Sequence, residues 1–175
     1  DLVPAYAMQT EPITPVDRTP LHTAYVKQHL LPAQRDEVRL LKQFLKGIGI
    51  YGAEIKVQGF SGYLAELLVI HYGSFRKVLA GASEWQKGTY IEVKRCEERV
   101  EKRGLYVVDP VDTKRNVASA LSFQNYARFI LASRLYLENP AFSYFFPQRR
   151  EVEYVPERNI VGIRIAVGRV VEDII

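Results

Sequence analysis

A threonine and a histidine stand where a predicted helix begins, a place that suits an anion. Thr19-Pro20 predicts the helix start, with Thr19 as the N-cap and Pro20 at the first helical position. His22 follows within the first turn, where backbone N–H groups lack helical partners and favour negative charge. Thr19 and His22 could therefore contact a phosphate. An ordinary surface histidine fits the same pattern, so the residues alone leave both interpretations open.

Lys42 and Tyr51 form a second candidate pair. Lys42 lies in a predicted helix beside the apolar Leu41, and Tyr51 follows the glycine-containing end of that helix. We expect the loop to bring Tyr51 close to Lys42. A lysine ammonium makes charge-assisted contacts with phosphate, and a tyrosine hydroxyl can donate a hydrogen bond. The alternatives are a solvated lysine and a tyrosine ring that covers the core.

The segment 50–68 is rich in glycine at its start and apolar at its end. Four glycines lie in it or directly before it: Gly49, Gly52, Gly59 and Gly62. Ser61 precedes the apolar run and is a typical N-cap, so a third helix is predicted to begin there. Backbone without Cβ atoms can approach an anion closely when it leads into a helix. A purely structural turn is the alternative.

A mostly helical chain must position these side chains. Apolar periodicity and flanking Pro, Gly and Ser residues predict five helices, near 19–30, 33–46, 61–72, 74–83 and 122–138. One face of the second helix is apolar and consists of Val38, Leu41, Phe44 and Leu45. Strands are predicted at 90–94 and 105–108, with lone strands at 1–8 and 160–171. The predicted class is α+β, mostly helical, with partial strands at both ends.

Composition narrows the classes of function. The 175 residues suit one domain, or one plus a fragment, and the net charge of +4 is compatible with a polyanionic partner. No apolar run of about 18 residues is present, so no membrane-spanning helix is expected. The single Cys96 excludes an intrachain disulfide and a cysteine metal cluster, and it favours a cytoplasmic location. His71, in the apolar third helix, is expected to be packed in the core.

The aromatic residues support a hypothesis from another class. Residues 142–147 are expected to form an aromatic linker, whose Tyr144, Phe145 and Phe146 could stack on RNA bases. The chain would then be a non-catalytic RNA-binding or structural module. Core packing is the simpler explanation for aromatic residues in general.

Four segments, in order, resemble one family. They are VDRTPLH at 16–22, EVRLLKQFLKGIGIYGAE at 37–54, KVQGFSGYLAELLVIHYGSF at 56–75 and VVDPVDTKRNVASALS at 107–122. Together they are similar to the archaeal class I CCA-adding enzyme, a tRNA nucleotidyltransferase related to poly(A) polymerases and oligoadenylate synthetases. The resemblance covers about residues 1–147 and implies the central helical domain of that group. A poly(A)-polymerase-like nucleotidyltransferase is the alternative within the group.

The resemblance implies an activity and assigns site residues. The family adds CCA to tRNA 3′ ends from CTP and ATP without a nucleic-acid template. Phosphoryl transfer occurs at two Mg²⁺ ions held by three carboxylates, the third of which corresponds to Asp1, so Asp1 is the expected catalytic and metal-binding residue. Thr19 and His22 correspond to phosphate contacts, and Lys42 and Tyr51 correspond to triphosphate contacts.

Arg115 corresponds to an arginine that helps the family to select the base. Cytosine and adenine each present an acceptor nitrogen beside an exocyclic amine, whereas uracil and guanine present an N–H at the matching position. Because arginine offers only donors, Arg115 would accept C and A and oppose U and G. The acceptor for the amine is expected to come from bound RNA. Without the resemblance, the sequence favours an ordinary surface arginine at Arg115.

The resemblance also divides the chain. Residues 1–18 correspond to the last strand and exit of the catalytic head, 19–147 to the central helical nucleotide-binding domain, and 148–175 to a partial C-terminal tail. The family's first two carboxylates have no counterpart here, so we expect the chain to be inactive alone. The expected partners are the tRNA 3′ end, CTP and ATP, without a membrane. A homodimer formed through regions outside the chain is left open.

Overall fold

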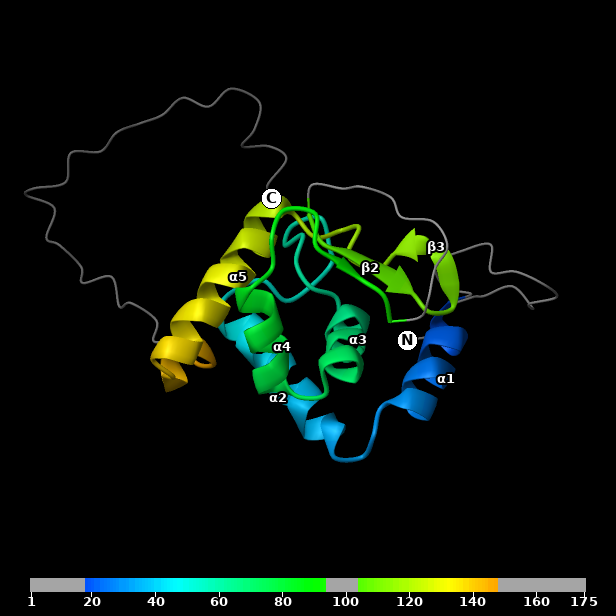
Figure 1. Cartoon of the computed structure of the whole chain (residues 1–175), viewed down its shortest axis with the longest axis horizontal. Coiled ribbons are helices and arrows are strands. Elements are labelled where there is room, and N and C mark those ends of the chain that lie inside the picture. Colours follow the sequence, from blue (N-terminus) through cyan, green and yellow to red (C-terminus); the bar gives the residue numbers. More distant parts are fainter. Residues whose placement is uncertain (1–17, 94–103, 148–175) are drawn as a thin grey trace, which may run out of the picture.

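The computed structural model describes residues 18–93 and 104–147 (Figure 1). The predicted strands at 1–8 and 160–171, and the expected metal ligand Asp1, lie outside these residues. The elements are α1 (Arg18–His29), α2 (Gln34–Gly47), α3 (Gly62–Tyr72), α4 (Phe75–Ser83), β1 (Tyr90–Ile91), β2 (Tyr106–Asp109), β3 (Asp112–Asn116), α5 (Phe123–Glu138) and the 3-10 helix η1 (Phe142–Tyr144). All predicted helices are present, and the mostly helical α+β class is confirmed.

Serine side chains cap three of these helices. Ser61 accepts a hydrogen bond from the backbone N–H of Leu64 at 3.1 Å. At the starts of α4 and α5, Ser74 and Ser122 each accept one from the backbone N–H three residues later. The predicted N-cap at Thr19 is wrong, because Arg18 is already helical. Pro20, the third residue of α1, is tolerated because N–H groups of the first turn have no partner within the helix. A proline near a helix start therefore indicates the first turn of the helix, but it does not fix the residue at which the helix begins.

The core lies between α2, α3, α4 and α5. The predicted apolar face of α2 is buried, and Phe44 at its centre is fully enclosed. The expected aromatic linker at 142–147 is wrong in part, because Phe145 is buried and Tyr144 stacks on Phe44 with ring centroids 5.9 Å apart. A Cβ atom at Gly47 would overlap the carbonyl oxygen of Tyr144, so glycine lets this segment close over α2.

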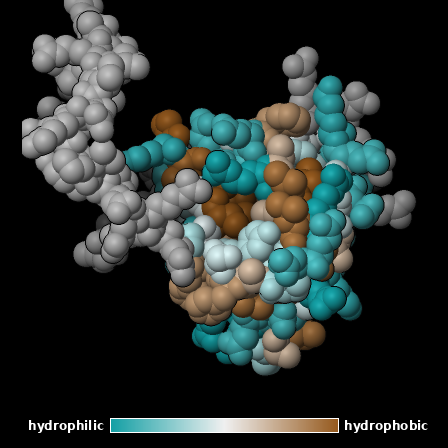
Figure 2. All heavy atoms as spheres, turned by 90° about the vertical axis from the view of Figure 1, so that its left-hand side faces the viewer, coloured by the Kyte–Doolittle hydropathy of each residue, from teal (hydrophilic) through white to brown (hydrophobic). Residues whose placement is uncertain are grey.

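Two of the three aromatic side chains proposed to stack on RNA are therefore occupied in packing. Phe146 remains exposed and stacks on Phe142, which is exposed as well. Figure 2 views the molecule from the side that lies to the left in Figure 1 and shows hydrophobic and hydrophilic residues mixed on that face. No helix in the described part of the chain has the length and apolar character needed to cross a membrane.

A small sheet carries a hairpin that sequence reasoning missed. β1 pairs with β2 in parallel, with Tyr90 opposite Tyr106, and β2 pairs with β3 in antiparallel fashion. β2 is buried throughout, whereas β3, with the sequence DTKRN, lacks apolar residues and gave no strand signal. Figure 1 shows this hairpin above α3 and near α1. Arg115 therefore lies on a strand and is held close to α1.

Candidate functional site

Lys42 and Tyr51 meet at the start of α3, as the sequence predicts. A Cβ atom built on Gly62, the first residue of α3, would lie 3.2 Å from the Tyr51 hydroxyl and 3.6 Å from the Lys42 Nζ atom. The loop between α2 and α3 is held by a parallel bridge between Tyr51 and Phe60. A cation and a hydroxyl thus converge on the first residue of α3, which has no side chain of its own.

This arrangement attracts negative charge. The N-terminus of α3 carries partial positive charge and backbone donors, of which the Ser61 side chain occupies one. Lys42 adds a full positive charge, and the Lys46 ammonium lies 5.2 Å from the centroid of the Tyr51 ring. The Lys42 ammonium is already paired with Glu66 at 2.7 Å, and both side chains are about one quarter exposed. Glu66 therefore competes with any anion for Lys42.

A cleft between α1 and α3 contains the second predicted pair. Its volume is about 380 Å³, and its lining is formed by Thr19, His22, Thr23, Val26, Lys27, Tyr63 and Glu66. Thr19 and His22 thus share a cavity with Glu66, the ion-pair partner of Lys42. All the predicted phosphate contacts therefore lie around the N-terminal half of α3.

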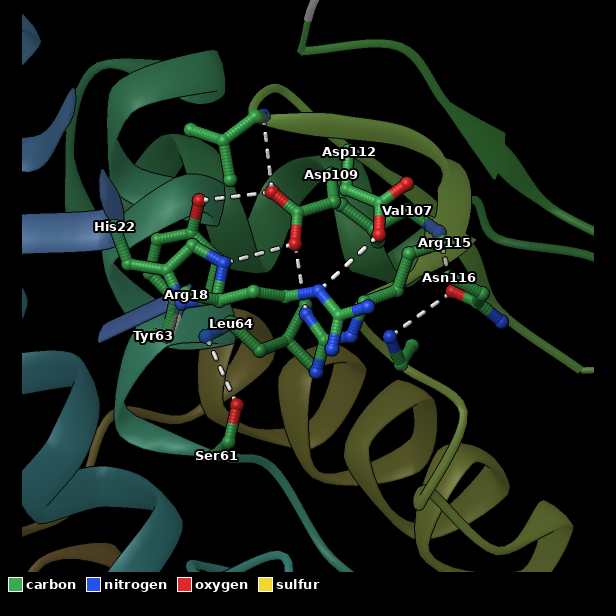
Figure 3. Close-up of polar contacts among 12 residues, drawn as sticks. Arg18, His22, Ser61, Tyr63, Leu64, Val107, Asp109, Asp112, Arg115 and Asn116 are labelled. Carbon is green, nitrogen blue, oxygen red and sulfur yellow. Dashed lines mark hydrogen bonds and ion pairs between the residues drawn. The ribbon is translucent and has the colours of Figure 1, made fainter. Parts of the chain in front are cut away.

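Asp109, at the end of β2, connects this cleft to Arg115 (Figure 3). Its carboxylate has no solvent exposure. The Oδ2 atom accepts hydrogen bonds from His22 Nε2 at 2.9 Å and from Arg115 Nη1 at 2.7 Å. The Oδ1 atom accepts from the Tyr63 hydroxyl at 3.2 Å and from the Val111 N–H at 3.1 Å. Sequence reasoning treated Asp109 only as a strand end and missed this role.

The network fixes the charge of Asp109. Burial alone would raise its pKa, but the hydrogen bonds from His22, Val111 and Arg115 outweigh burial and hold the pKa below its usual value of 3.8. The Tyr63 pKa is raised by burial and by the neighbouring Asp109 charge, so its hydroxyl stays protonated and can donate. The Tyr63 ring also stacks on His22, with ring centroids 3.9 Å apart. His22 is held from two sides.

The acid stability of the protein should depend on Asp109. Because its pKa in the folded state lies below 3.8, its stabilising contribution is complete above pH 3.8 and is lost as the pH falls through the folded-state pKa. We expect Asp109→Asn to lower the free energy of unfolding by about 1–3 kcal/mol at pH 7. This difference between the variant and the original protein should shrink by pH 3. Urea unfolding at the two pH values measures it, and a difference independent of pH would contradict the prediction.

The structure thus places five of the six predicted site residues. Thr19 and His22 line the cleft, Lys42 and Tyr51 meet at Gly62, and Arg115 reaches His22 through Asp109. Three further residues were missed, namely Asp109, Tyr63 and Glu66. One signal was available for Asp109, an ionisable residue directly after the apolar run 105–108. Residues 18–93 and 104–147 contain no group of three or more His, Cys, Asp or Glu side chains that could hold a metal ion.

A family model for the second domain of tRNA nucleotidyltransferases matches residues 36–146. The chain belongs to the tRNA nucleotidyltransferase family. The matched part of this nucleotidyltransferase chain includes Lys42, Tyr51, Asp109 and Arg115, whereas Thr19 and His22 precede it.

Curated relatives of this nucleotidyltransferase chain are archaeal CCA-adding enzymes. That of Saccharolobus solfataricus is 52% identical over 157 residues, which cover 89% of this chain and 38% of the relative. That of Sulfurisphaera tokodaii is 49% identical over 178 residues, which cover 100% of this chain and 43% of the relative. The predicted resemblance to archaeal CCA-adding enzymes is confirmed. The chain spans about two fifths of the length of these relatives.

Proposed function

We propose that the chain is the nucleotide-binding part of a tRNA nucleotidyltransferase that adds CCA to tRNA 3′ ends from CTP and ATP. Residues 19–147 would form the central domain, 1–18 would lead out of a catalytic head, and 148–175 would begin a C-terminal tail. The observation that carries the proposal is the convergence of the Lys42 ammonium and the Tyr51 hydroxyl on Gly62. The location would be the cytoplasm, where tRNA and both nucleotides are available.

The chemistry of a triphosphate fits this place. A nucleoside triphosphate carries roughly four negative charges near neutral pH. The start of α3 offers it a helix N-terminus, an ammonium and a hydroxyl donor, and the lack of a Cβ atom at Gly62 lets both side chains lie close to the helix start. The cleft beside it, about 380 Å³ in volume, provides Thr19 and His22 for the remaining phosphate oxygens. The base would then extend toward Arg115.

Phosphoryl transfer itself is assigned to the catalytic head. Two Mg²⁺ ions held by its carboxylates would neutralise the charge that develops on the transferred phosphate. Asp1, the expected carboxylate of this chain, lies outside the described residues, and we derive no step through the metal. The described residues would bind and orient the nucleotide, which is how protein groups other than metal ligands contribute to such reactions.

Nucleotide titration tests the proposal. We define the intact protein as this chain together with the catalytic head that the proposal assigns to it. Tyr51→Phe removes only a hydroxyl, and we expect it to weaken binding of CTP and ATP by about 2- to 10-fold, the usual range for a lost hydrogen bond. Tyr136→Phe, which removes a tyrosine hydroxyl on α5 from a ring that packs on Phe44 away from the site, is the control. Binding of tRNA without any nucleotide binding would instead favour the RNA-binding module.

Removing the charge of Glu66 should tighten nucleotide binding. Glu66 holds the Lys42 ammonium at 2.7 Å in a partly exposed ion pair, and a triphosphate must compete with it. Such pairs contribute up to about 1 kcal/mol, so Glu66→Gln should lower the dissociation constants of CTP and ATP by about 2- to 5-fold. Calorimetry with non-hydrolysable analogues measures the change. Weaker binding would mean that Glu66 positions Lys42 rather than competes for it.

A further inference from the structure

We infer that Asp109 is a positioning residue that couples the phosphate contact of His22 to the base contact of Arg115. This inference rests on the proposed function, since it requires that His22 and Arg115 face different parts of one nucleotide. Its physical content is that a single buried carboxylate oxygen serves both side chains. Recognition of the base and binding of the triphosphate would then be linked through Asp109, which contacts neither part of the nucleotide.

The geometry of the carboxylate leaves it little freedom. Oδ2 accepts from His22 at 2.9 Å and from Arg115 at 2.7 Å, and Oδ1 is occupied by Tyr63 and the Val111 N–H (Figure 3). With two donors on each oxygen, rotation of this carboxylate, which has no solvent exposure, would break several hydrogen bonds at once. The side chains of His22 and Arg115 are therefore fixed relative to each other, although 93 positions separate them in the sequence.

The attachment of α1 makes this link important. α1 has no fully buried residue, and Tyr25 packs against the core only as a partly buried side chain. Two polar contacts to the β2–β3 hairpin help to fix the orientation of α1. His22 contacts Asp109, and Arg18 contacts Asp112 at 3.2 Å. The stacking of Tyr63 on His22 adds a contact from α3. A displacement of Arg115 is therefore expected to reach His22, because Asp109 is the hydrogen-bonding partner that both share.

A bound nucleotide would use this coupling. A base that pairs well with Arg115 leaves the guanidinium in the place where Asp109 holds it, so His22 also stays in place for the phosphates. A base that opposes Arg115 pushes the guanidinium away and leaves the buried Asp109 charge with one partner fewer, a costly state. The wrong base would thereby weaken the phosphate grip as well. Asp109 would extend base selection to the triphosphate without contacting either part of the nucleotide.

A double-mutant cycle tests the inference in the intact protein. His22→Ala and Arg115→Ala are made singly and together, and dissociation constants for a non-hydrolysable CTP analogue are measured. We expect the combined loss to differ from the product of the single losses by about threefold or more, as for residues within one network. In the Asp109→Asn background the two losses should multiply simply. Asp112→Asn, which removes the other hairpin contact to α1, is the matched control and should leave the coupling unchanged.

The outcomes separate the inference from the proposed function. If the original protein does not bind the CTP analogue, the proposed function is overturned and the inference falls with it. If it binds the analogue but neither single substitution weakens binding, the inference alone is overturned. If both weaken binding but their effects multiply in the original background, the inference is overturned and the proposed function stands. If the coupling persists in the Asp109→Asn background, Asp109 is not the link. Should that variant fail to fold, the cycle in the original background and its Asp112→Asn control still decide.

Discussion

Replacing Arg115 by alanine in the intact protein is expected to reduce discrimination against UTP and GTP by about 10- to 100-fold. The guanidinium offers only donors, which suit the acceptor nitrogens of cytosine and adenine and oppose the N–H groups of uracil and guanine. Arg115 is held by the buried Asp109 at 2.7 Å, yet its side chain is 34% exposed, so part of it remains accessible to a base. The measurement is the ratio of kcat/KM for CTP to that for UTP, and of ATP to GTP.

Two further variants show whether the loss belongs to base recognition. Lys114→Ala removes an exposed charge from the same strand and should leave the ratios unchanged. Arg115→Lys keeps a positive charge beside Asp109, which protects the fold, but lacks the planar fork of donors. It should lose selectivity nearly as far as the alanine variant. Unchanged ratios in both Arg115 variants would show that another group reads the base.

The parts of the fold that depend on local patterns could be predicted from the sequence. The apolar face of α2 follows from spacings of three and four, and its four predicted members are buried. Ser61 and Ser74 are N-caps because each stands directly before an apolar helix and leaves its side chain free to accept an N–H. The convergence of Lys42 and Tyr51 also follows from local order, since one short loop separates them.

The parts that depend on distant contacts could not be predicted. β3 is polar, so neither periodicity nor hydrophobicity marks it, and it forms only because β2 provides a partner. Asp109 and His22 are 87 positions apart, and the local sequence around either residue gives no sign that the two are in contact. His71 was expected in the core but is exposed, because the buried side chains of α3 lie on its other faces. The overall apolar character of a helix does not show whether a single histidine in it lies on the buried or the exposed face.

The site was therefore predicted as separate residues rather than as one constellation. Residue types and spacing indicated Thr19, His22, Lys42 and Tyr51, and the resemblance added Arg115, but neither indicated the groups that hold them. Asp109, Tyr63 and Glu66 are such groups, and each acts through contacts with a segment distant in sequence. A residue that contacts the ligand can be recognised by its chemistry, whereas a residue that positions another is recognised by its neighbours.

Lys42→Ala should weaken the binding of CTP and ATP by a similar factor, about 10- to 100-fold for each. The triphosphate is common to both nucleotides, so a contact to it cannot distinguish them. The lost ammonium is the full positive charge that lies nearest to the start of α3, and its removal also leaves Glu66 facing the site without its partner. Both changes disfavour an anion. Calorimetry with non-hydrolysable CTP and ATP in the intact protein measures the two losses.

The comparison between variants decides what Lys42 does. Lys77→Ala removes an exposed lysine from α4 and should leave both affinities within about twofold of the original. Adding Glu66→Gln to Lys42→Ala should restore part of the lost affinity, because the uncompensated carboxylate no longer repels the phosphates. A loss confined to one nucleotide would place Lys42 at the base instead of the triphosphate. The double variant then separates repulsion by Glu66 from loss of the ammonium itself, since only the first is reversed.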